Sequence, residues 1–250
     1  MDFDGKLGKY KIIETLDQTK TLWSEYFNEA FHNLFGAYEE TLYNYISGCH
    51  IEDQLKALQS VHVLDVGFGL GIGLKAFIDV IDKHKTPGIN HSYTSIELDE
   101  DLFLWSIKET FPNCKFVKKD QTYVCMLPHL SITVYIGDGR KTLPEAFHKN
   151  LLPKFTAIFQ DAFSPKQNPI LWTVEWFDDL KMMASPEVYL STYSSSVSVR
   201  KSMIAAGWVV MNVKGFGQKR TMTKARTFGV TDSATAAELS RSPALELRDN

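Results

Sequence analysis

Cysteines and long apolar runs are scarce in this sequence of 250 residues. There are three cysteines, Cys49, Cys114 and Cys125, and their odd number and uneven spacing argue against a disulfide framework or a zinc site. The histidines form no pair at helical spacing. No uncharged apolar run approaches the roughly 20 residues that a membrane-spanning helix needs, and the first residues lack a signal-peptide core. We therefore expect a cytoplasmic protein with no membrane contact and no bound metal.

Charge is nearly balanced overall but uneven along the chain. The formal net charge is −3, which argues weakly against wholesale nucleic-acid binding. No acidic residue occurs between Glu187 and Asp232, whereas seven cations do: Arg200, Lys201, Lys214, Lys219, Arg220, Lys224 and Arg226. Such a run is most often a solvated face, so it indicates an anion site only if other features supply a reason.

Strand-like and helix-like segments alternate through the middle of the chain. Short apolar runs at 61–66, 93–98, 132–136, 155–159, 188–192 and 208–213 are typical of buried strands, with helices expected over 70–81 and 101–110. This alternation predicts a Rossmann-like, doubly wound α/β sheet that is mostly parallel. Residues 221–228 follow the sixth run too closely for a helical crossover, so an antiparallel hairpin is expected there.

The pattern divides the chain into three parts. Residues 1–55 do not follow it and are expected to form a small N-terminal extension. Residues 56–230 form the predicted α/β domain. Residues 231–250 are polar and aperiodic, which predicts a flexible tail.

Glycines follow the first predicted strand, where sheets of this kind bind ligands. The sequence from Asp65 carries Gly67, Gly69 and Gly71, with Phe68 between the first two. The dinucleotide pattern G-x-G-x-x-G is met only in its Gly/Ala form from Gly71, too late after the strand, and no nucleoside-triphosphate loop is present. A dense glycine loop after a carboxylate suits S-adenosylmethionine, whose sulfonium and amino groups are cationic.

Acidic residues also end the next two strands. Glu97 is placed to accept hydrogen bonds from ribose hydroxyls, and Asp138 is placed to meet the adenine amino group. Either residue alone is more simply interpreted as an acidic side chain that faces solvent in a turn than as a cofactor ligand. Three consecutive strand-end acids favour a cofactor site.

The fourth strand ends in Asp161-Ala162-Phe163-Ser164-Pro165. An alkylamine resembling lysine has a pKa of roughly 10.4 and arrives as ammonium. Asp161 can orient that ammonium and take its proton, while Phe163 and Pro165 form a dry wall. The simpler alternative is that Asp161 caps the following helix.

These motifs resemble the methyltransferase module of the MnmC family, which modifies the wobble uridine of transfer RNA. The resemblance runs from about residue 23 to 228, and its most specific landmarks lie at 161–165, 168–172 and 215–222. It implies a class I methyltransferase sheet that converts 5-aminomethyl(-2-thio)uridine to the 5-methylaminomethyl form, with Asp161 as base. The family's flavin-binding oxidase domain has no counterpart in these 250 residues, so no FAD is expected, and other tRNA-modifying enzymes would supply the aminomethyl group.

The resemblance suggests a function for the cations between Glu187 and Asp232, which is to bind RNA. It implies that Lys219, Arg220, Lys224 and Arg226 contact phosphates of the tRNA anticodon arm, while the wobble base leaves its stack. Tyr193, Phe163 and Trp172 are candidate stacking partners, although each is more often a core aromatic.

Two other functions remain open from the residues alone. A polyamine-type aminopropyltransferase, or another small-amine methyltransferase, would share the sheet, but a polyamine needs acids where this hairpin is basic. A non-catalytic RNA-binding protein would keep only the scaffold, and failure to bind cofactor would support it.

Overall fold

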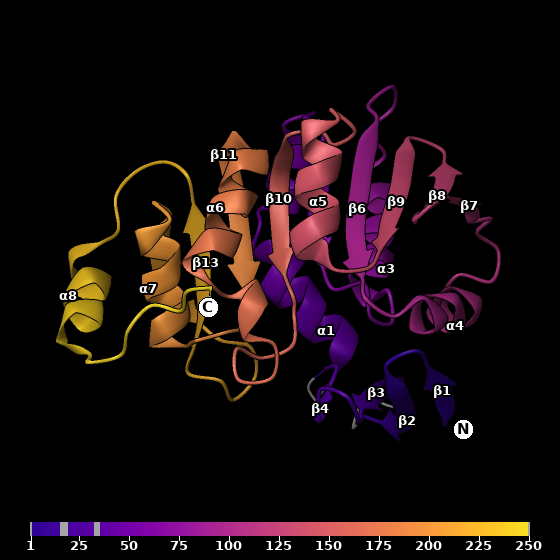
Figure 1. The fold of residues 1–250 in the computed structure, drawn as a ribbon. Coiled ribbons are helices and arrows are strands. Elements are labelled where there is room, and N and C mark those ends of the chain that lie inside the picture. The colour runs from indigo at the N-terminus through magenta and orange to yellow at the C-terminus, as the bar shows by residue number, and fades with distance from the viewer. Residues whose placement is uncertain (1, 16–19, 33–35, 250) are drawn as a thin grey trace.

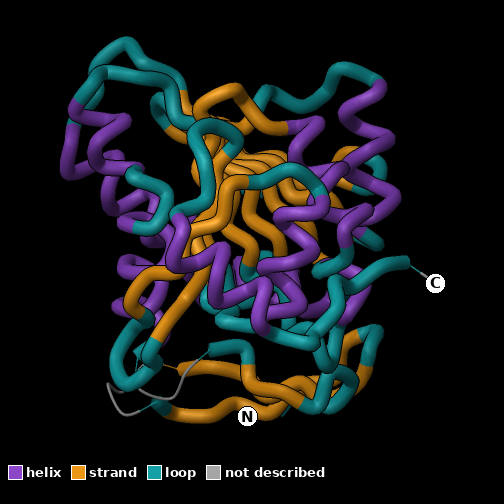
Figure 2. The backbone as a smooth tube through the Cα atoms, turned by 90° about the vertical axis from the view of Figure 1, so that its left-hand side faces the viewer, coloured by secondary structure: helices purple, strands orange, loops and turns teal. Residues whose placement is uncertain are grey.

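The computed structural model of this protein describes residues 2–15, 20–32 and 36–249. It contains two sheets, with the larger one sandwiched between helices (Figures 1 and 2). Among the described residues, no helix combines the length and apolarity required to span a bilayer.

The larger sheet has nine strands in the order β12-β13-β11-β10-β5-β6-β9-β8-β7. Its five central strands, all parallel, are β11 (Ala184–Thr192), β10 (Phe155–Gln160), β5 (His62–Val66), β6 (His91–Glu97) and β9 (Leu130–Ile136). Antiparallel strands extend both edges: β12 (Val209–Lys214) and β13 (Thr221–Arg226), and β7 (Val117–Lys119) and β8 (Thr122–Leu127). The predicted mostly parallel sheet with a C-terminal hairpin is confirmed, whereas β7 and β8 were not predicted.

Helices cover both faces of this sheet because strand side chains alternate between two apolar cores. One core joins the strands to α2 (Ile51–Lys56) and α3 (Ile72–His84), and α4 (Glu100–Thr110) also packs into it. The other joins them to α5 (Gly139–His148), α6 (Val174–Met183) and α7 (Val197–Ala205). In β5, Val63 points into the first core and Leu64 into the second.

The smaller sheet is antiparallel and comes from the N-terminal residues. Its strands are β1 (Phe3–Gly5), β2 (Gly8–Glu14), β3 (Lys20–Ser24) and β4 (Glu29–Ala30). Asp99, which caps α4, fastens it by accepting hydrogen bonds from the backbone of Lys6 and Leu7 and from the Tyr10 hydroxyl. The sheet therefore lies at one end of the α/β domain (Figure 1).

The predicted boundary at residue 55 differs from the packing of the chain. The segment after the small sheet forms α1 (Ala37–Thr41), the π-helical turn η1 (Leu42–Ser47) and α2. Tyr45, Cys49 and Ile51 are buried in the same core as Val63. Residues 37–56 thus pack with the α/β domain, because their apolar side chains cover its sheet. Residues 1, 16–19 and 33–35 of the predicted extension lie outside the described residues.

The C-terminal residues are also more regular than their composition predicts. Residues Ser233–Arg241 form α8, capped by Asp232, whose side chain accepts a hydrogen bond from the Thr235 backbone. The backbone oxygen of Leu247 then accepts a hydrogen bond from Val174, and Asp249 pairs with Arg140 at 2.8 Å. The sequence predicts a flexible tail here, whereas residues 233–249 form a helix and tertiary contacts that local patterning does not reveal. Residue 250 lies outside the described residues.

Candidate active site

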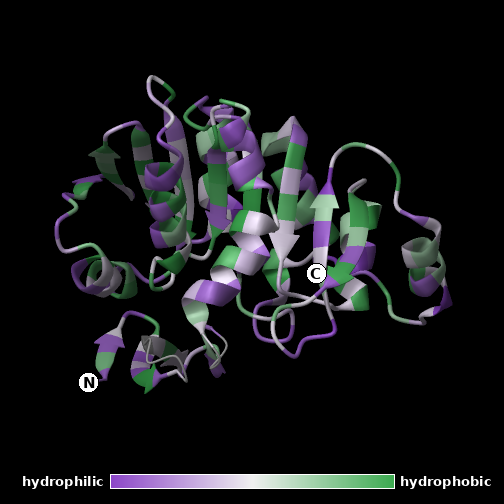
Figure 3. Ribbon diagram, turned by 180° about the vertical axis from the view of Figure 1, so that it is seen from behind, coloured by the Kyte–Doolittle hydropathy of each residue, from purple (hydrophilic) through white to green (hydrophobic). Residues whose placement is uncertain are grey.

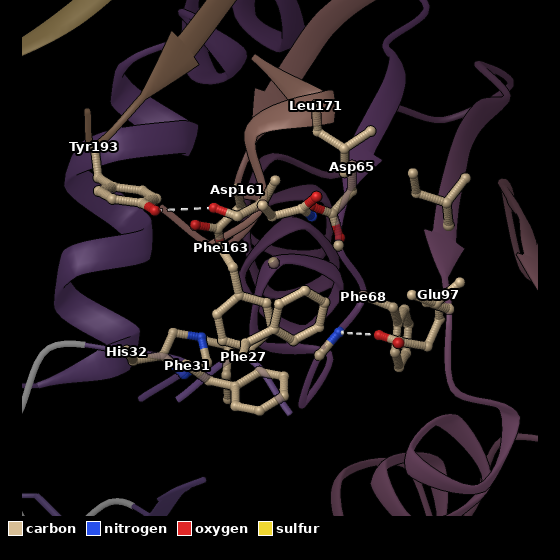
Figure 4. A pocket seen from close by; sticks show the side chains of 18 of the residues that line it. Phe27, Phe31, His32, Asp65, Phe68, Glu97, Asp161, Phe163, Leu171 and Tyr193 are labelled. Carbon is tan, nitrogen blue, oxygen red and sulfur yellow. Dashed lines mark hydrogen bonds between the residues drawn. The ribbon is translucent and has the colours of Figure 1, made fainter. Parts of the chain in front are cut away.

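A cavity of about 550 Å³ opens at the carboxyl ends of the parallel strands. Its floor comes from the turns after β5, β6, β9 and β10, and its roof from residues 27–32 and 40–45. Figure 4 shows Asp65 and Asp161 pointing into it from neighbouring strands. This volume accommodates a cofactor together with part of a second ligand.

The glycine loop after β5 exposes main-chain atoms to this cavity, because Gly67 and Gly69 have no side chains. Gly67 and Gly69 line it and have φ angles of +110° and +52°, a region that favours glycine. A Cβ on Gly67 would lie 3.2 Å from the backbone oxygen of Asp161, so a side chain here would crowd the next strand end. The loop is therefore shaped for close approach of a ligand to the main chain.

Gly71 has a different role from the one predicted. It is the residue that precedes α3, with φ +74°, and it does not line the cavity. A Cβ there would lie 2.7 Å from the Phe111 ring and 2.9 Å from the Phe68 ring. Gly71 thus lets these rings pack, which holds Phe68 against the cavity wall.

Glu97 is fixed in place by the backbone around it. One carboxylate oxygen accepts a hydrogen bond from Gly69 and the other from Asp99, each at 3.0 Å (Figure 4). Burial raises the pKa of Glu97 to about 7, although these two bonds oppose the shift. Its oxygens have lone pairs left for ligand hydroxyl groups.

Asp65 is the second buried carboxylate at this end. The Tyr93 hydroxyl donates to it at 2.7 Å and the Ser95 hydroxyl at 3.2 Å. Burial raises its pKa to about 7 as well. A cationic ligand would stabilise the charged forms of both Asp65 and Glu97. The third predicted acid, Asp138, lines the cavity and caps α5 through a 3.0 Å bond from Arg140.

These features fit S-adenosylmethionine. Gly67 and Gly69 leave room for the ligand against the main chain, and the two buried carboxylates match its positive charge.

Asp161 lies across the cavity, at the end of β10. Burial raises its pKa well above the usual range, and the negative charges of Asp65 and Glu40 add to the shift. The Tyr45 hydroxyl opposes it by donating a short hydrogen bond to the carboxylate. A carboxylate with a raised pKa is a stronger base than one in water, so it suits proton removal from an ammonium group.

An ion pair and an aromatic ring flank Asp161. The Lys219 ammonium lies 3.0 Å from Glu40 and 5.0 Å from the centre of the Tyr193 ring. The Tyr193 hydroxyl donates to the backbone oxygen of Ala162 at 2.9 Å. Tyr193 and Lys219 therefore line the cavity, where the sequence predicted substrate contacts.

The roof over Asp161 is aromatic. The Phe163 ring stacks on Phe27, with centroids 4.2 Å apart, and meets the edge of Phe31 at 4.8 Å (Figure 4). Glu29 ties the same loop to the small sheet by accepting a hydrogen bond from the Ser164 backbone at 3.1 Å. His32 is kept neutral because burial lowers its pKa to about 4. These rings form an aromatic wall over the cavity.

Five predicted substrate residues do not line the cavity: Pro165, Trp172, Arg220, Lys224 and Arg226. Trp172 is fully buried in the core and donates from its ring nitrogen to the backbone oxygen of Phe163 at 2.8 Å. It cannot stack on a substrate there, and it supports the Phe163 loop instead. Arg220 is exposed on the hairpin loop, and Lys224 and Arg226 lie further along β13.

Sequence reasoning missed a group of cavity residues from the first 45 positions: Phe27, Glu29, Phe31, His32, Glu40, Asn44 and Tyr45. They follow no strand end and form no motif with fixed spacing. All of them fall within the stretch from about residue 23 to 228 that carries the MnmC resemblance, which was the available signal.

Comparisons with known proteins agree with this geometry. A family model described as S-adenosyl-L-methionine-dependent methyltransferase matches residues 108–227, which include Asp138, Asp161 and Lys219. The tRNA 5-methylaminomethyl-2-thiouridine biosynthesis bifunctional protein MnmC of Ectopseudomonas mendocina is 27% identical over 220 residues, covering 80% of this chain and 32% of that protein. The uncharacterized protein MJ0670 of Methanocaldococcus jannaschii is 26% identical over 230 residues, covering 87% of this chain and 59% of that protein. The chain thus spans about a third of the MnmC proteins it matches.

Solved structures extend the comparison to the whole fold. MNMC2 from Aquifex aeolicus superposes with a TM-score of 0.79 at 28% identity, covering 99% of this chain and 81% of that chain. Spermidine synthase from Thermotoga maritima gives 0.55 at 14% identity, covering 98% and 79%, and shares the fold. The resemblance inferred from the sequence motifs is confirmed.

Proposed function

We propose that this chain, which is related to MnmC and MnmC2, is an S-adenosyl-L-methionine-dependent methyltransferase that methylates the amine of 5-aminomethyl(-2-thio)uridine at the tRNA wobble position. The observation that carries the proposal is the half-buried Asp161 carboxylate, whose pKa is raised and which faces the same cavity as the glycine loop. The printed function of the MnmC relatives supports the choice of acceptor.

One end of the cavity binds the cofactor and the other end binds the acceptor. Gly67 and Gly69 admit the cofactor against the main chain, Glu97 accepts hydrogen bonds from its hydroxyl groups, and Asp65 offsets its positive charge. When bound, the cofactor supplies an electrophilic methyl group. Holding both reactants in line removes much of the entropic barrier to displacement.

Asp161 prepares the acceptor. The aminomethyl group arrives as ammonium, and Asp161 takes one proton so that the nitrogen lone pair becomes available. A nitrogen–carbon bond then forms as the sulfur–carbon bond breaks, giving a methylammonium group and neutral S-adenosylhomocysteine. Tyr45 orients the carboxylate through its hydrogen bond, and Phe27 and Phe163 keep water away.

The anticodon arm of tRNA is the proposed partner. A wobble nucleotide turned out of its stack would place its base against the aromatic roof. The aminopropyltransferase alternative is not favoured, since the likeness to spermidine synthase extends only to the fold.

Mass spectrometry of nucleosides tests the proposal. Transfer RNA that carries 5-aminomethyl-2-thiouridine is incubated with enzyme and S-adenosylmethionine and then digested. One added methyl on that nucleoside supports the proposed reaction. An unchanged nucleoside, with cofactor binding shown by calorimetry, would mean that the acceptor is a different amine.

A further inference from the structure

The C-terminal part of the acid-free segment folds into β12, β13 and the loop between them, at one edge of the large sheet. In β13, Lys224 pairs with Ser191 and Met211, and Arg226 pairs with Tyr189 and Val209. Residues directly opposite in antiparallel strands point to the same side of a sheet. Lys224, Arg226, Tyr189, Val209 and Met211 therefore share one face, which we call the basic face.

Helix α7 covers the opposite face of these strands. Its Arg200 donates hydrogen bonds to Thr223 at 2.9 Å and to Asn212 at 3.0 Å, and both lie on alternate positions to Lys224 and Met211. Seen from behind, no helix of the described chain lies in front of this edge of the sheet (Figure 3). The basic face is consequently open along β12 and β13, and its side chains are half-buried.

The cations on the basic face lack acidic partners. Neither Lys224 nor Arg226 forms an ion pair with a described residue, and the Nε atom of Arg226 is buried without a hydrogen-bond partner. The one acid within these three strands, Glu187, lies near the start of β11 and is exposed. Elsewhere on the molecule many lysines are paired, as Lys75 is with Asp79 at 2.7 Å.

Aromatic rings lie beside Arg226. The Arg226 guanidinium lies 4.8 Å from the centre of the Phe228 ring, which meets Tyr189 edge-on at 5.5 Å. The centres of the Tyr189 and His50 rings are 4.6 Å apart, so Phe228, Tyr189 and His50 form a row of three rings. His50 also pairs with Asp53. A basic face with half-buried rings beside it is typical of surfaces that hold single-stranded nucleic acid.

The basic face begins next to the cavity. Lys219 lines the cavity, and β13 starts two residues later at Thr221. At about 3.3 Å per residue, the chain from Lys219 to Arg226 reaches roughly 20 Å from the cavity. Lys224 and Arg226 are about 7 Å apart on one face, a distance that permits contact with neighbouring phosphates.

We propose that the basic face binds the RNA strand that continues from the nucleotide held in the cavity. Lys224 and Arg226 contact its phosphates, and Tyr189, Phe228 and His50 offer ring faces or edges to its bases. This inference rests on the proposed function for its choice of RNA. Two cations about 7 Å apart, with a row of rings beside Arg226, match the phosphates and bases of an RNA strand better than they match an acidic protein surface or a second copy of this chain.

The test compares two variants with the same change in net charge. Lys224→Gln/Arg226→Gln alters the basic face, and the control Lys141→Gln/Lys149→Gln alters two exposed lysines, one in α5 and one directly after it. Binding of a fluorescent anticodon stem-loop transcript, without cofactor, is measured from 50 to 200 mM salt. We expect the basic-face variant to bind about tenfold more weakly at 50 mM, with a log–log salt slope smaller by about two. Lys224→Arg/Arg226→Lys should bind like the wild type.

Further readouts separate this inference from the proposed function. Cofactor affinity by calorimetry and thermal unfolding should match the wild type in both double variants, which shows that the fold persists. RNA binding does not require methyl transfer, so it can succeed even if the wobble uridine is not the acceptor. Equal losses in the two glutamine variants, or no RNA binding by the wild type at 50 mM salt, would overturn the inference. So would a wild-type dimer in sedimentation that Lys224→Gln/Arg226→Gln abolishes.

Discussion

The hydroxyl of Tyr45 donates a short hydrogen bond to the Asp161 carboxylate, joining η1 to the end of β10. These residues are separated by 116 positions, and the buried Tyr45 ring also packs on Phe159 with centroids 5.3 Å apart. The bond both orients the carboxylate and lowers its pKa against the effect of burial. Proton transfer in the cavity therefore depends on a residue that no strand-end motif indicates.

Tyr45→Phe should slow catalysis without weakening cofactor binding. Loss of a hydrogen bond to a charged group costs about 1.5–3 kcal/mol, so kcat/KM should fall roughly 10- to 100-fold. The pKa of Asp161 rises when the donor is lost, and the acidic limb of the pH profile should move to higher pH because the base must be ionised. Steady-state kinetics between pH 6 and 9 measure both effects. Tyr38→Phe removes a similar bond, to Asp79 outside the cavity, and should leave the profile unchanged; a profile that moves equally in both variants would contradict the assignment.

Cofactor affinity should increase as pH rises from 6 to 8. Asp65 and Glu97 have pKa values raised to about 7, so each holds a proton at pH 6 in the free protein. A cationic ligand favours the ionised carboxylates, and binding must release those protons; the affinity gain is up to about tenfold per group for each pH unit below its pKa. Calorimetry in buffers of different ionisation enthalpy counts the protons. Glu97→Gln should release fewer, and an affinity independent of pH in the wild type would refute the electrostatic role.

The aromatic roof should affect the acceptor and leave the cofactor unaffected. Phe27→Leu removes the ring that stacks on Phe163, an arrangement worth about 0.5–1.5 kcal/mol beyond burial. We expect KM for the acceptor tRNA to rise by roughly 2- to 12-fold, with cofactor affinity unchanged. Phe147→Leu, on α5 and outside the cavity, is the control. If Phe27→Leu changed only the cofactor affinity, Phe27 would contact the cofactor and not the acceptor, which would contradict this assignment.

The positions that sequence reasoning found share one property. Asp65, Glu97 and Asp161 each follow a short apolar run, and parallel strands bring all such ends to one edge, so local patterning and a topology rule suffice. Glu40, Tyr45 and Phe27 reach the same cavity only through tertiary packing of α1, η1 and the small sheet. No local pattern encodes that packing.

For the aromatic residues, sequence reasoning predicted too many site residues rather than too few. Phe163 and Trp172 lie nine positions apart in one loop, and composition treats them alike as stacking candidates. The structure turns Phe163 into the cavity and Trp172 into the core, where its ring nitrogen supports the Phe163 backbone. The choice depends on how the loop meets α6 and the sheet, which the residue types alone do not specify.

Buried Arg200 should be important for stability. Its guanidinium, 1% exposed, bonds to Thr223 and Asn212 and pairs with Glu238 of α8 at 3.6 Å. Arg200→Met removes the guanidinium donor from the side-chain oxygens of Asn212 and Thr223, at a cost of about 1–3 kcal/mol, so Tm should fall by roughly 2–12 °C. Thermal unfolding followed by circular dichroism measures it. Glu238→Gln, at a half-exposed position, should change Tm by less than about 4 °C; equal losses in the two variants would show that the ion pair, and not the buried network, is stabilising.

The most direct test of the account is a single-turnover experiment on Asp161. Wild type and Asp161→Asn are saturated with methyl-labelled cofactor, whose binding calorimetry checks in each, and mixed with tRNA bearing 5-aminomethyl-2-thiouridine. The account predicts label on the amine nitrogen with the wild type, and a rate about 10²–10⁴-fold lower with Asp161→Asn at equal cofactor occupancy. Transfer at the wild-type rate by Asp161→Asn would contradict the central claim that the Asp161 carboxylate prepares the acceptor amine.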